Sequence, residues 1–184
     1  LSCDEYYQYI KDRVNLESLI DWSIYEGYAA NHDLAVNVRY YRSTEYDDNR
    51  WHYALFDMDY GFDGPATFDY ILKNYWHGTL FKRLLMNPEF CDLFLTRMAY
   101  LSENYLTDEN VMENFRTLES QIRSEIPNNQ LRWGGNGVFA WERHLTKLEG
   151  FLTSGRIEQM KRSIAGAMHI SLDEVNRYFH EGAT

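Results

Sequence analysis

Three aspartates and one asparagine in the first third of the chain could form a metal site: Asp33, Asn37, Asp57 and Asp59. Carboxylates that pack together repel one another and lose hydration unless a cation, a proton or a basic group compensates them. Mg²⁺ suits that role, because proteins usually hold it with one or two carboxylates, several waters and the phosphates of a substrate. The pattern therefore predicts metal-dependent chemistry at this point of the chain.

The order of these residues is also similar to the way a protein kinase arranges its base and its metal ligands. Residues 31–33, Asn-His-Asp, loosely resemble the kinase catalytic loop, and residues 59–61, Asp-Tyr-Gly, resemble its metal-binding Asp-Phe-Gly triplet. In this interpretation Asp33 is the general base that accepts the proton of a substrate hydroxyl. Asn37 would bind a metal through its carbonyl oxygen. The plainer alternative is that both are turn residues.

A β-hairpin is expected to bring the four residues together. Residues 38–42 and 51–56 are rich in aromatic and β-branched side chains, and the polar residues 43–50 between them supply a turn. The first two candidates precede the first strand and the last two end the second, so all four are expected at the open end. The two-residue period of a strand would place Asp57 and Asp59 on one face, within reach of one ion.

Helices are expected to form the rest of the chain. The first long one begins after an N-cap at Asn15 and delivers residues 31–33 at its C-terminal end, with Asp21 and Glu26 as solvated charges. Residues 65–75 show no clear period, and Pro127 is expected to end a helix before a loop at 131–137. Apolar spacing and caps predict further helices at 4–13, 76–85, 88–101, 111–126, 138–152, 154–168 and 171–179.

The composition excludes some classes of function. A net charge of −10 argues against a nucleic-acid partner, whose phosphates need a basic surface. The histidines lack zinc-ligand spacing, and no apolar run is long enough to span a bilayer. Cys3 and Cys91 are too few for a disulfide framework and could pair or stay free. The 15 tyrosines and five tryptophans favour an aromatic core over a glycan-binding surface.

Residues 15–42, followed by 51–64, resemble the CotH family of spore-coat-type atypical secreted kinases. In that family an Asn-x-Asp segment follows a helix, and a later strand that begins with Trp ends in Asp-x-Asp-x-x-Phe/Trp-Gly. Here the second motif reads DMDYGFDG, with one extra residue between Phe62 and Gly64, and Asp63 is a weaker site candidate. Later helical segments, including Arg156, also fit, so the resemblance covers most of the chain.

The resemblance implies an α+β fold that is mainly α-helical and similar to the C-terminal lobe of a protein kinase, with a small β-hairpin carrying the acidic site. Residues 1–184 are expected to form one domain. No Gly-rich loop precedes Asp33, and Lys11 is the only lysine before it, so the N-terminal nucleotide-binding lobe is expected to be absent and the chain to be excised from a longer parent. Whether this fragment acts alone is left open.

The activity implied is Mg²⁺- or Mn²⁺-dependent transfer of the ATP γ-phosphate to Ser or Thr of a secreted or surface protein. The expected partners are ATP, that protein substrate and other domains of the parent chain, at an extracellular, cell-surface or spore-coat location. The alternative is a non-catalytic structural or binding module of a larger bacterial surface or spore-coat protein, in which the same acids hold Ca²⁺. The number and length of the oxygen contacts would distinguish the two ions.

Overall fold

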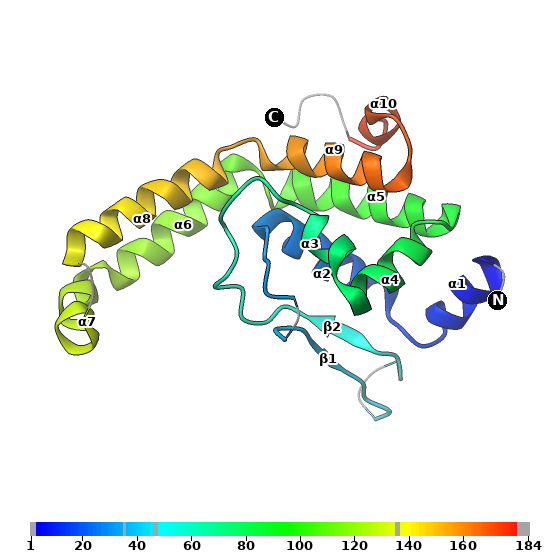
Figure 1. Cartoon of the computed structure of the whole chain (residues 1–184), viewed down its shortest axis with the longest axis horizontal. Helices are drawn as coiled ribbons and strands as arrows, with labels where there is room; N and C mark the ends of the chain where they lie inside the picture. The colour runs from blue at the N-terminus through cyan, green and yellow to red at the C-terminus, as the bar shows by residue number, and fades with distance from the viewer. Residues whose placement is uncertain (1–2, 35, 46–47, 135–136, 180–184) are drawn as a thin grey trace.

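In the computed structural model, the described residues 3–34, 36–45, 48–134 and 137–179 form a mainly helical structure with one small sheet (Figure 1). The expected α+β composition is therefore confirmed. The elements in chain order are α1 (Cys3–Lys11), α2 (Leu16–Ala29), β1 (Arg39–Tyr41), β2 (His52–Ala54), α3 (Asp69–Lys73), α4 (Tyr75–Leu84), α5 (Pro88–Asn104), α6 (Asp108–Ile122), α7 (Ile126–Trp133), α8 (Gly137–Leu152), α9 (Arg156–Met168) and α10 (Leu172–Asn176).

Helix α2 lies at the centre of the core. It begins as predicted, because the Asn15 side chain accepts a hydrogen bond from the Ser18 amide at 2.9 Å. Its apolar residues, such as Leu19 and Ile24, are buried, and the helix packs against α3, α5, α9 and β2. Glu26 on the same helix is also buried, which corrects the expectation that it is solvated. Because neighbouring elements cover most of the surface of α2, few of its positions are exposed enough to keep a charged side chain in water.

The predicted β-hairpin is present and is attached to the first half of α2. The strands β1 and β2 are antiparallel, with Tyr40 opposite Tyr53, and the Tyr53 amide donates to Ser18 Oγ at 3.1 Å. The second strand ends earlier than predicted, so Asp57 and Asp59 lie in the loop after it and do not share a strand face. The chain turns there, because Asp57 has a φ of 53°.

Two segments differ from the expected secondary structure. Residues 65–75, which show no clear period, contain the short helix α3, and its neighbour Phe68 is fully buried. Pro127 does not end the helical region: after a 3₁₀ turn it lies in the first turn of α7. Proline is tolerated there because the first amides of a helix need no intrahelical acceptor. Helix α7 includes 131–133 of the expected loop, whose residues 135–136 lie outside the described part.

Helices α6, α7 and α8 form an arm that extends away from the rest of the molecule (Figure 1). Helices α6 and α8 pack against each other along it, and α7 contacts α8 at its tip. Large apolar side chains on the arm are exposed, with Leu131 86%, Trp133 72% and Phe139 73% accessible. No helix in the described ranges combines the length and apolar character that crossing a membrane requires. Cys3 and Cys91 are free thiols that form no disulfide.

Candidate functional site

Asp33 and Asn37, the candidate base and the first candidate ligand, lie together in one turn after α2. The Asn37 side-chain amide donates to Asp33 Oδ2 at 2.9 Å, and its backbone amide donates to the Asp33 carbonyl at 3.3 Å. Both side chains are half-buried. The contact fixes the direction of the Asp33 carboxylate and leaves its second oxygen without a hydrogen bond to the described residues.

The turn that carries Asp33 follows directly from the C-terminal cap of α2. Ala30 adopts the left-handed conformation with a φ of 54°, and the amides of Ala30 and Asn31 return to the carbonyls of Gly27 and Glu26. This is the 6→1 and 5→2 pattern that satisfies carbonyls at a helix end. It turns Asn31 into the core, where its Oδ1 accepts from the Asp33 amide at 3.1 Å. The end of α2 therefore determines where Asp33 lies.

A buried carboxyl group lies next to this turn. Burial raises the pKa of Glu26 to about 7, and the neighbouring Asn31 amide and Trp22 indole oppose that rise. Within the described residues, neither Glu26 carboxylate oxygen has a hydrogen-bond partner of good geometry. A charged carboxylate in such surroundings is costly, so the proton stays on Glu26 to a much higher pH than on an exposed glutamate.

The two sequence motifs meet at the C-terminal end of α2. The rings of His32 and Tyr60 are in edge contact, with centroids 5.3 Å apart, and the Phe62 amide donates to the Ala29 carbonyl. Gly61 permits this approach, since a Cβ there would lie 3.0 Å from the Ala29 oxygen. The segment containing Asp33 and the segment containing Asp59 are thus held side by side.

Arg156, at the start of α9, makes hydrogen bonds that connect the end of α2 to the loop after the second motif. Its guanidinium donates to the carbonyls of Gly27 and Tyr28, both at 3.0 Å, and to the Ala66 carbonyl at 2.7 Å. It is 1% exposed and pairs with no carboxylate among the described residues, so burial lowers its pKa to about 10. The end of α2, the loop after the second motif and α9 are therefore joined by one side chain. We call these contacts the α2 junction.

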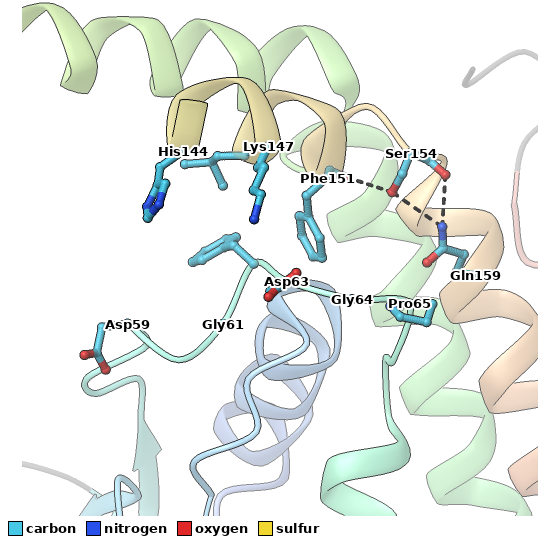
Figure 2. Close-up of a pocket in the computed structure, with 12 residues that line it drawn as sticks. Asp59, Gly61, Asp63, Gly64, Pro65, His144, Lys147, Phe151, Ser154 and Gln159 are labelled. Atoms are coloured by element: carbon cyan, nitrogen blue, oxygen red, sulfur yellow. Dashed lines mark hydrogen bonds between the residues drawn. The ribbon is translucent and has the colours of Figure 1, made fainter. Parts of the chain in front are cut away.

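A pocket of about 730 Å³ opens beside the second motif (Figure 2). One wall consists of Asp59 and the loop residues 61–65, and the other consists of α8 side chains, including His144 and Lys147, with Ser154 and Gln159 beyond them. Phe62 and Phe151, whose ring centroids are 6.0 Å apart, join the two walls. The volume lies within the range of small-molecule sites, and the pocket is open to solvent rather than enclosed.

The four predicted residues do not form one compact cluster. Asp33 pairs with Asn37, Asp59 lines the pocket, and Asp57 is exposed in the loop before it. Among the described residues, no three His, Cys, Asp or Glu side chains are grouped so that they could hold a metal ion. The assignment of Asp33 as base and of the other three as metal ligands stays a prediction.

Several residues around the site were not identified from the sequence. Lys147, His144 and Gln159 line the pocket, yet they come from helices whose only sequence signal is their apolar period. The burial of Glu26 could have been predicted from the sequence. It lies seven residues after the buried Leu19 and therefore on the same helical face.

The comparisons with known proteins give one match. Residues 2–156 match the model of a family described as CotH kinase protein, and this range includes both motifs and ends at Arg156. No curated protein and no solved structure matches the chain.

Proposed function

Because the chain belongs to the CotH kinase protein family, we propose that it takes part in metal-dependent transfer of the ATP γ-phosphate to a Ser or Thr hydroxyl of a protein. The proposed partners are ATP, that protein and other domains of a longer parent chain. A location outside the cell, on its surface or in a spore coat is proposed from the family.

The contact between His32 and Tyr60 is the observation that carries this proposal. It joins the segment with the candidate base to the segment with the candidate metal ligand, although the two are separated by the whole hairpin. In phosphoryl transfer the protein mainly positions groups and stabilises charge, so the placing of these two segments matters most. The Phe62 to Ala29 hydrogen bond supports the same arrangement.

Asp33 is suited to the role of base. One of its oxygens is held by the Asn37 amide, and its backbone is held by the buried Asn31. A carboxylate fixed in this way can accept a proton from a hydroxyl group placed against its other oxygen.

The donor atoms at the site fit Mg²⁺ or Mn²⁺. Asp57 and Asp59 offer hard carboxylate oxygens, and Asn37 offers an amide oxygen. Mg²⁺ needs only one or two protein carboxylates, because phosphate oxygens and water complete its coordination. When bound with ATP, such an ion would neutralise charge on the phosphates. Asp59, exposed at the pocket, is the residue best placed to hold it.

The test is a transfer assay with radiolabelled ATP and Mn²⁺ on a Ser/Thr-rich acceptor protein. We expect Asp33→Asn to reduce transfer at least a hundredfold and to leave Mn²⁺–ATP binding, measured by calorimetry, nearly unchanged. Asp59→Asn should abolish that binding.

Asp173→Asn is the matched control, since it changes an exposed acid on α10 that belongs to neither motif and does not line the pocket. Equal transfer by wild type and Asp33→Asn would contradict the proposal. Tight Ca²⁺ binding without any nucleotide binding would favour the non-catalytic, cation-stabilised module instead.

A further inference from the structure

The pocket beside Asp59 has walls of opposite charge. Asp59 and Asp63 stand on the loop wall, and Lys147 and His144 stand on the α8 wall. Figure 2 shows both α8 side chains pointing from the helix toward the loop that carries the two aspartates. His144 and Lys147 are three residues apart, so they occupy the same helical face.

The charges of the two walls are not paired with each other. Among the described residues, Lys147 makes no ion pair, hydrogen bond or ring contact, although two carboxylates line the same pocket. Two other lysines in the described part of the chain do pair with a carboxylate, Lys11 with Glu89 at 2.6 Å and Lys161 with Glu158 at 2.8 Å. The space of about 730 Å³ therefore separates a free ammonium group from free carboxylates.

A ligand that fills this space must satisfy both walls. A cation alone would be attracted to the aspartates and repelled by Lys147. An anion alone would be attracted to Lys147 and repelled by the aspartates. A divalent cation that carries a phosphate group matches both, because the cation faces Asp59 and the phosphate oxygens face the ammonium group.

We propose that the pocket is a phosphate-binding subsite in which Lys147 contacts a phosphate group whose metal ion is held by Asp59. This inference rests on the proposed function and deepens it, since it gives this chain a phosphate-binding lysine of its own, on α8. The phosphate could belong to the nucleotide or to the phosphorylated product.

Calorimetric titration of Mn²⁺–ATP tests the proposal on four proteins: wild type, Lys147→Met, Lys147→Arg and Lys82→Met. Lys82 is the matched control, an exposed lysine on α4 outside the pocket. We expect Lys147→Met to weaken binding by roughly tenfold or more, because a charge-assisted hydrogen bond is lost. Lys147→Arg should retain most of the affinity, and Lys82→Met should bind as wild type does. Thermal unfolding verifies that the variants are folded.

A second titration, with Mn²⁺ alone, separates a phosphate contact from general damage to the site. Lys147→Met should bind the bare ion at least as tightly as wild type, since a repelling charge is removed. Weakened binding of the bare ion would overturn the proposal. A phosphoserine peptide with Mn²⁺ identifies the source: a larger effect of the substitution on this peptide than on ATP would assign the phosphate to the product.

The failures of the two proposals can be told apart. Unchanged Mn²⁺–ATP and phosphopeptide binding by Lys147→Met would overturn the subsite, while the transfer assay with Asp33→Asn would still decide the kinase function. Absence of transfer by wild type, together with phosphate binding that depends on Lys147, would refute the activity and leave the subsite in place.

Discussion

The α2 junction and the arm are built in opposite ways from similar helices. At the junction almost every side chain of the last turns of α2 is buried, and Arg156 donates hydrogen bonds to the buried carbonyls of Gly27 and Tyr28. On the arm, Met112 is the one buried residue of α6, and α7 has none. Burial is what fixes side chains in one position, so the geometry is most precise at the junction where the two sequence motifs meet.

The α2 junction and the arm also differ in how much they contribute to the free energy of unfolding. Apolar burial stabilises a fold roughly in proportion to the area removed from water, so the core around α2 supplies most of the stability. The end of the arm formed by α7 and the start of α8 contributes little to it, because Leu131, Trp133 and Phe139 are exposed to solvent there. Substitutions at the two regions should therefore differ greatly in effect, and three measurements examine this contrast.

The largest effect is expected at Arg156. Arg156→Met removes the guanidinium donor from the buried Tyr28 carbonyl, the half-buried Ala66 carbonyl and the Gly27 carbonyl, which keeps only the Ala30 amide, and this should lower the free energy of unfolding by about 3 kcal/mol. Urea denaturation measures the loss, and Arg156→Lys, which keeps the charge, serves if the methionine variant does not fold. Arg132→Met on the arm is the control, with a change within about 0.5 kcal/mol. Equal losses for the two arginines would remove the contrast.

Glu26 should show an intermediate effect that depends on pH. Its pKa is about 7 in the folded protein and 4.5 in its ordinary state, so the folded protein binds the proton more tightly. The stability that Glu26 contributes is complete below pH 4.5 and is lost as the pH rises through 7. Glu26→Gln should lack this decline and exceed wild type at pH 8 by on the order of 2 kcal/mol.

Denaturation at pH 4.5 and pH 8 measures this difference. Glu142→Gln, which changes an acid of the arm, should show no comparable dependence on pH. A wild-type protein whose stability rises steadily from pH 4.5 to 8, with Glu26→Gln following the same curve, would contradict the buried state of Glu26.

The smallest effect is expected at the tip of the arm. Leu131→Ala removes a side chain that is 86% exposed, so the free energy of unfolding should change by less than about 0.5 kcal/mol. The matched change Leu19→Ala, at a residue 2% exposed, should cost about 3 kcal/mol. Thermal unfolding of both variants measures the two values. A loss above about 1.5 kcal/mol for Leu131→Ala would show that the arm is covered in solution.

The parts predicted correctly from the sequence are those with local causes. Asn15 is three residues from the amide that it caps, and the hairpin follows from alternating aromatic strands around a polar turn. Pro127 was misjudged because the same residue stops one helix or opens the next, and only its neighbours in space decide between the two.

The site was predicted less completely because its parts meet through tertiary contacts. The loop wall of the pocket comes from residues 59–65, while Lys147 lies on a helix far along the chain. The apolar period predicts that helix but does not say which loop it covers. Similarly, the strand period placed Asp57 and Asp59 on one face, whereas β2 ends at Ala54 and the chain turns at Asp57.

The hydrogen bonds of Arg156 also set an order for assembly during synthesis. Its partners Tyr28 and Gly27 lie 128 and 129 residues earlier in the chain, so the ribosome makes α2 long before the side chain that satisfies its last carbonyls. Chains emerge at roughly 5–20 residues per second, and N-terminal segments begin to fold first. For several seconds α2 and the hairpin exist without Arg156, and its hydrogen bonds to Gly27 and Tyr28 form only when α9 has left the ribosomal tunnel.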